Sequence, residues 1–130
     1  MQKKCLRNIH KAAYNAHTNV LFQNSNILNL DNIYKYQILS FMYDYHTNSV
    51  PVPLRDFFTS NSAVHTHGTR QAFMPHRSCV NTNKLLKSFA HAGPKLWMEV
   101  PQNIRNNILH KKSFKRNIKK YLQSIVNTKP

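Results

Sequence analysis

Two segments of the chain share one apolar spacing that places large side chains on a single face of a helix. In both, these side chains recur at i, i+4, i+7, i+8 and i+11. The positions are Tyr34, Ile38, Phe41, Met42 and Tyr45 in the first segment, and Phe114, Ile118, Tyr121, Leu122 and Ile125 in the second. With 3.6 residues per turn, each set forms one stripe. We therefore predict two amphipathic helices whose stripes are buried in a core.

Polar residues indicate where these two helices begin. Asp31 precedes the first stripe, and a carboxylate there accepts from the free amide groups of the first turn, so we predict Asp31 as the N-cap of a helix over 31–46. Ser113 takes the same role for a basic C-terminal helix over 113–126. The sequence after 46 contains two prolines and cannot continue the first helix.

The rest of the chain has weaker patterns. Short helices are predicted at 3–13, at 17–24 and at 54–59, where Phe57 and Phe58 are expected to be buried. The sequence therefore predicts a mainly α, small irregular helical domain over 1–130.

Residues 60–83 are rich in Ser, Thr, Asn and His and predict a long polar loop. A weak alternation of apolar residues within 68–92 is compatible with a short β-hairpin that pairs 70–74 with 85–90.

The stretch HAGPKLW predicts a structural corner. Gly93 is one of two glycines in the chain and directly precedes Pro94, while Trp97 is the only tryptophan. Glycine allows a backbone conformation that other residues resist, and proline favours the first position of a turn or short helix. We expect the Trp97 ring to be buried as an anchor, and Pro101 to open a turn that runs through Ile104.

Charge is the strongest constraint on partners. Nineteen Lys and Arg face four Asp and Glu, giving a formal net charge of +15. Such an excess favours a polyanion, and RNA or DNA is the usual one because its phosphates need no sequence-specific contact. An anionic membrane surface ranks second, although no run approaches the roughly 18 apolar residues that span a bilayer. A basic composition with no functional meaning is the remaining alternative.

The acidic and glycine residues exclude several enzyme classes. Asp31 and Asp44 lie at opposite ends of one predicted helix, and Asp56 and Glu99 are isolated from both in sequence. A two-metal nucleotidyl-transfer site needs carboxylates that converge on the ions. Two glycines cannot build a Gly-rich phosphate loop or a nucleophile elbow. We therefore expect no catalytic residues and no cofactor in this chain.

Histidine and cysteine spacings raise a metal site as an alternative. His65, His67, His76 and Cys79 have H-x-H and H-x-x-C spacings that can hold zinc. No C-x-x-C half-site accompanies them, and eight histidines make chance neighbours common, so we predict no metal site. Cys5 and Cys79 are expected to be reduced thiols, because no apolar signal segment follows the basic N-terminus and the chain is predicted to be intracellular.

Basic side chains are the candidate nucleic-acid contacts. Three interpretations of the C-terminal helix are open. Its apolar stripe packs on the rest of the domain and its cations contact phosphate, or the helix lies on a membrane surface, or its charged face is only solvated by water. The predicted contact residues are Lys112, Lys115, Arg116, Lys119 and Lys120, then Lys3, Lys4 and Arg7, and finally Arg70 and Arg77.

Ordered short motifs over about 120 residues give the chain a family resemblance. The positions are Gln2–Arg7 with Ile9, then His17, Thr18, Leu21 and Phe22, then Ile27, Leu28, Leu30, Asp31, Ile33, Tyr34, Gln37 and Phe41–Tyr43, then Phe57, Phe58, His65 and Thr69–Gln71, then Gly93–Trp97, Pro101 and Ile104, and last Phe114, Lys115 and Lys119–Leu122. In this order they resemble the C-terminal, post-palm part of the reverse transcriptases of non-LTR (LINE-type, jockey-like) retrotransposons. Val20, Met98 and Val100 depart from the residues usual in that family.

The resemblance implies a limited function. The parent family copies RNA into DNA with magnesium, but its catalytic aspartates lie in the palm, upstream of the part that this chain resembles. This piece would correspond to the thumb and following region, which grips the template–primer duplex and packs on the missing polymerase core. The resemblance also implies a truncated or degenerate element copy, so a pseudogene product or an interaction fragment without activity of its own is the alternative.

Overall fold

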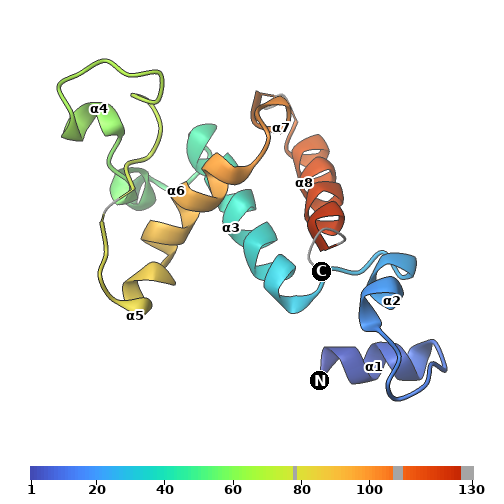
Figure 1. Ribbon diagram of the computed structural model, residues 1–130. Coiled ribbons are helices and arrows are strands. Elements are labelled where there is room, and N and C mark those ends of the chain that lie inside the picture. The colour runs from blue at the N-terminus through green and yellow to red at the C-terminus, as the bar shows by residue number, and fades with distance from the viewer. Residues whose placement is uncertain (78, 107–109, 127–130) are drawn as a thin grey trace.

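The computed structural model describes residues 1–77, 79–106 and 110–126, and the predicted mainly α fold is confirmed (Figure 1). The elements are α1 (Gln2–Ile9), α2 (Thr18–Asn24), α3 (Leu30–His46), the 3₁₀ helix η1 (Val52–Phe57), α4 (Asn61–Val64), α5 (Asn83–Leu86), α6 (Phe89–Glu99), α7 (Gln102–Asn106) and α8 (Lys111–Val126). None of the helices in the described ranges combines the length and apolarity needed to cross a bilayer.

Helix α3 forms the centre of the fold. It packs against α6 and against α8, and Figure 1 shows these two helices on different sides of it. The most deeply buried side chains come from these three helices and the residue that follows α6: Leu39, Met42, Pro94, Trp97, Val100, Phe114, Ile118 and Leu122. The core therefore joins segments that are more than fifty residues apart in sequence.

The two long helices begin earlier than predicted. Asn29, not Asp31, is the N-cap of α3, because its extended backbone lets Oδ1 accept from the backbone N–H of Asn32 at 2.8 Å. Asp31 lies one residue into the helix, where a carboxylate still favours the positive end of the helix dipole. Helix α8 starts at Lys111, so Ser113 is a first-turn residue rather than its cap.

In the α8 stripe, Phe114, Ile118 and Leu122 are buried as predicted, and Tyr121 and Ile125 are partly buried. The α3 stripe is less completely covered. Ile38 and Met42 are 4% and 0% exposed, but Tyr34 keeps 51% of its surface in contact with solvent. Leu39 and Tyr43, which flank the stripe, are buried as well. The buried surface of α3 is wider than one stripe because two helices cover it from different sides.

The shorter elements also differ from expectation. Helix α1 ends at Ile9 instead of 13, because Lys11 adopts a left-handed backbone with φ of 49°. Helix α2 matches the predicted 17–24 closely. After η1, Phe58 is buried, whereas Phe57 is 47% exposed, so the prediction that both rings are buried was wrong for Phe57.

The β-hairpin within 68–92 is not formed. Among the residues that the structure describes, the β-pairing is one antiparallel bridge between Ser60 and Pro75, and residues 85–90 belong to α5, a turn and the start of α6. Thr82 caps α5 by accepting from the N–H of Leu85, and Ser88 is the N-cap of α6. The alternation that resembled a strand therefore comes from the end of α5 and the start of α6.

Gly93 and Pro94 do not form a turn; both lie inside α6. Gly93 serves packing, because an added Cβ would lie 3.0 Å from Met42 Sδ and 3.3 Å from Phe58 Cζ. Pro94 cannot donate to the carbonyl of Ala90, and the helix tolerates that lost hydrogen bond. Trp97, one turn further on, is 2% exposed, as predicted.

Candidate nucleic-acid interface

Helix α8 separates an apolar face from a basic face. At about 100° per residue, Phe114, Ile118 and Leu122 fall within one arc of about 80°. The five predicted contact cations occupy a separate arc about 140° wide, which begins about 20° beyond the apolar one. These are Lys112, Lys115, Arg116, Lys119 and Lys120, of which the first, third and fifth are exposed and the other two half-buried. Because the helix contains no aspartate or glutamate, the whole basic arc has one sign of charge.

Contacts on its buried side fix the orientation of α8. The Phe114 ring lies 4.6 Å from the Tyr43 ring of α3 and 5.8 Å from the Trp97 ring of α6, between centroids. Asn32 Nδ2 donates to the Leu122 carbonyl at 2.9 Å, and the Tyr121 hydroxyl donates to the Glu99 carbonyl at 2.9 Å. These contacts hold the helix so that its cations face solvent.

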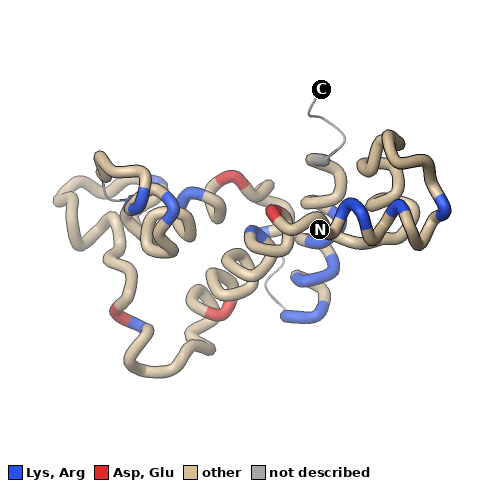
Figure 2. Tube along the Cα trace, turned by 90° about the horizontal axis from the view of Figure 1, so that it is seen from below, with Lys and Arg blue, Asp and Glu red and all other residues tan. Residues whose placement is uncertain are grey.

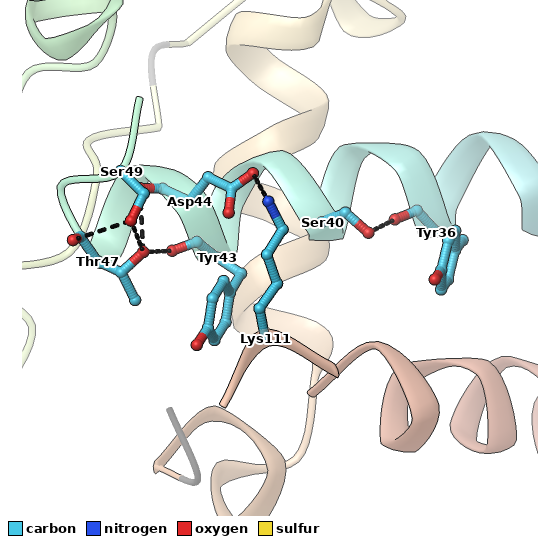
Figure 3. Close-up of polar contacts among 7 residues, drawn as sticks. All are labelled: Tyr36, Ser40, Tyr43, Asp44, Thr47, Ser49 and Lys111. Atoms are coloured by element: carbon cyan, nitrogen blue, oxygen red, sulfur yellow. Dashed lines mark hydrogen bonds and ion pairs between the residues drawn. The ribbon is translucent and has the colours of Figure 1, made fainter. Parts of the chain in front are cut away.

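An ion pair joins the first residue of α8 to the last turn of α3. Lys111 Nζ donates to Asp44 Oδ2 at 2.7 Å, as Figure 3 shows. The Thr47 hydroxyl donates to the Tyr43 carbonyl at 3.0 Å and closes the same end of α3 (Figure 3). Lys111, which was not among the predicted contacts, therefore has a structural partner. Within 1–77, 79–106 and 110–126, none of the five cations on the basic arc pairs with a carboxylate.

The predicted cations of α1 divide into two kinds. Lys3 and Lys4 are exposed. Arg7 is half-buried; its Nε donates to the Ala16 carbonyl at 3.0 Å, and its guanidinium lies 6.0 Å from the centroid of the Tyr14 ring. Arg7 therefore holds the loop between α1 and α2, and two cations of α1 are left for an external anion.

The remaining predicted contacts lie elsewhere. Figure 2 shows Lys and Arg in several separate groups, with those of α1 and α8 toward one end of the molecule. Arg70 and Arg77 are exposed but belong to the segment around α4, which Figure 1 places at the opposite end. The structure therefore separates Arg70 and Arg77 from the cations of α1 and α8.

A buried aromatic cluster lies where α3, α6 and α7 meet. The His46 ring stacks on Trp97 at 4.6 Å between centroids and 19° between planes. Burial, and secondarily the positive charge of Arg105, lower the pKa of His46. His46 Nε2 and Arg105 Nε are buried and have no hydrogen-bond partner among the described residues. This environment favours the neutral imidazole.

The four candidate metal ligands of the polar loop are not gathered. The His65 and His76 rings lie 5.5 Å apart between centroids, and His76 Nδ1 pairs with Asn61 Oδ1 at 3.1 Å. Cys79 is an exposed free thiol, as is Cys5. In the part of the chain that the structure describes, no three His, Cys, Asp or Glu side chains lie close enough to hold a metal ion.

Sequence reasoning missed a second group of cations. Lys35, Lys87 and Lys95 border one groove between α3, α5 and α6. They are spread over sixty residues and share no motif, so no local signal identifies them. Only the packing of α6 on α3 brings them together.

Comparison of this chain with protein-family models, curated proteins and solved structures gave no match. The resemblance to non-LTR reverse transcriptases therefore rests on the ordered motifs alone.

Proposed function

We propose that this chain binds the phosphate backbone of RNA or DNA through the basic arc of α8, without catalysis of its own. The observation that carries the proposal is the five-cation arc, free of carboxylates, beside an apolar stripe whose Phe114, Ile118 and Leu122 are buried. A buried stripe gives the helix a fixed orientation, so its cations act as one surface.

The dimensions of the arc suit a polyanion. Lys112 and Lys120 are eight residues apart, which is about 12 Å along a helix. Double-stranded DNA carries one charge per about 1.7 Å of axis, so several phosphates lie within that span. Lysine and arginine side chains reach phosphates without reading bases, so the contact is non-specific. Lys3 and Lys4 of α1 are exposed and add to the positive charge of the molecule.

The family resemblance supports the same function. In that family the corresponding region grips the template–primer duplex, which is a backbone contact. We extend the proposal accordingly: the chain corresponds to the thumb and following region of a non-LTR reverse transcriptase. The RNA-to-DNA copying activity belongs to the palm of the parent family, and no position of this chain matches its catalytic residues.

Fluorescence anisotropy with a labelled RNA–DNA hybrid and a labelled DNA duplex of equal length tests the proposal. Five phosphate contacts predict that log K falls with log salt at a slope of about −4.5 for the duplex between about 50 and 200 mM salt. The variant Lys112→Gln/Arg116→Gln should reduce the slope to about −2.7, because it removes two contacts.

A matched variant removes two exposed cations outside the arc. Arg55→Gln/Lys84→Gln lowers the net charge equally and should change the slope much less. Equal effects of the two variants would assign the affinity to overall charge, and an affinity that ignores salt would overturn the proposal. The first result would remove α8 as the contact surface, and the second would favour an interaction fragment without nucleic-acid binding.

A further inference from the structure

An open groove lies between α3 and the α5–α6 pair, away from the basic arc of α8. Its volume is about 680 Å³, within the range of sites that hold small ligands. Leu86, Ala92 and Leu96 line it with apolar surface, and Tyr34 lines it from α3. The exposure of Tyr34 and Leu86, at 51% and 44%, shows that this surface is accessible.

The orientation of the Tyr34 ring is tethered. Its hydroxyl donates to the carbonyl of Lys87, the C-cap residue of α5, at 3.2 Å. This hydrogen bond links two segments that lie 53 residues apart. A tethered aromatic ring beside apolar side chains presents a flat surface on which another ring can stack with little loss of conformational freedom.

The charges around the groove favour an anion. Lys35, Lys87 and Lys95 contribute three cations, and Glu99 contributes one carboxylate. The excess of two positive charges favours an anionic ligand. The Glu99 carboxylate repels negative groups, so those of the ligand should lie near the three lysines. The groove thus combines an aromatic and apolar surface with separate cations.

We infer that this groove binds one unpaired base of a single-stranded nucleic acid, stacked against Tyr34, with the adjoining phosphates held by Lys35, Lys87 and Lys95. A base within a duplex is stacked on both sides and cannot enter, so the site selects a single strand. This inference extends the proposed function from backbone contacts to a base contact, and it rests on residues outside α8.

Two single-stranded probes of equal length and charge separate base binding from phosphate binding. One is a labelled twelve-nucleotide oligo-dT, and the other is a labelled twelve-nucleotide strand in which every position is abasic. The native chain should bind oligo-dT at least about fivefold more tightly, the lower limit for one stacked base. Tyr34→Ala should abolish this preference, and Tyr34→Phe, which keeps the ring, should retain most of it.

Tyr14→Ala is the matched control, because Tyr14 is 87% exposed and lies beyond α1, far from the groove in sequence. It should leave the preference unchanged. Circular dichroism should show equal helix content in all the variants, since both tyrosines are at least half exposed.

Three results would overturn the inference: equal binding of the two probes to the native chain, a preference that survives Tyr34→Ala, or an equal loss in Tyr14→Ala. Its failure is distinguishable from failure of the proposed function. If the groove does not bind a base, the duplex should still bind with the expected salt slope. If the chain prefers oligo-dT but does not bind the duplex, only the proposed function of α8 is contradicted.

Discussion

Gly93 shows how a single residue is constrained by its neighbours rather than by its own backbone. Its φ is not positive, so the conformational freedom of glycine is not what the site requires. The position is buried, and Met42 from α3 and Phe58 from the segment after η1 come close to its Cα. The absence of a side chain lets α6 approach both.

Gly93→Val should therefore destabilise the protein by about 1–3 kcal/mol, the usual cost of adding side-chain volume to a packed site. Urea denaturation measures the change in the free energy of unfolding. Ala90→Val, at an exposed position of the same helix, is the control and should cost about 0.5 kcal/mol from helix propensity. A smaller cost at 93 than at 90 would contradict the close packing of α6 on α3.

At the scale of elements, a buried hydrogen bond joins the start of α3 to α8, at the end away from the Lys111–Asp44 ion pair. Asn32 is 4% exposed, and its Nδ2 donates to the Leu122 carbonyl near the end of α8. The backbone N–H of the same residue is bound by the Asn29 cap. Asn32 thus connects the start of α3 to the last turns of α8 and fixes their register.

Asn32→Ala should lower the free energy of unfolding by about 1–3 kcal/mol, because the variant loses a buried hydrogen bond. Gln37→Ala replaces an exposed amide on the same helix and should change the free energy by less than about 0.5 kcal/mol. Chemical denaturation of both variants gives the comparison. Equal effects would show that the Asn32 contact does not hold α8.

At the scale of the whole molecule, positive charge opposes the folded state. The net charge of +15 rises further when any of the eight histidines is protonated. His46 adds a specific contribution, because its pKa is lowered in the folded chain by burial and by Arg105. Below about pH 6.5 the unfolded chain binds a proton at His46 that the folded chain resists, so the free energy of unfolding falls as the pH falls.

Denaturation at about pH 7.5 and about pH 5.5 tests this contribution, since an ordinary histidine titrates between these values. His46→Phe keeps a ring on Trp97 and removes the titration, so its stability should fall less on acidification than that of the native chain. An identical loss in the native chain and in His46→Phe would contradict the lowered pKa.

The two long helices, α3 and α8, could be predicted from the residues alone, whereas α4, α5 and the start of α6 could not. The 3.6-residue period is local, so the stripe of α8 follows from the residues nearby. The basic arc beside that stripe follows from the same geometry. The N-cap residues could not be identified from the sequence. Asn29, Asp31 and Ser113 all have side chains able to cap, and the local backbone geometry determines which of them does.

Which parts of each helix face are covered depends on how the helices pack against one another. Tyr34 belongs to the same stripe as Ile38, yet the packing of α5 and α6 leaves Tyr34 at an open groove. The same packing gathers Lys35, Lys87 and Lys95, places Gly93 against Met42, and stacks His46 on Trp97. These contacts join residues far apart in the chain. The apolar period predicts which face of each helix is buried, but it does not say which helix packs against that face or how closely.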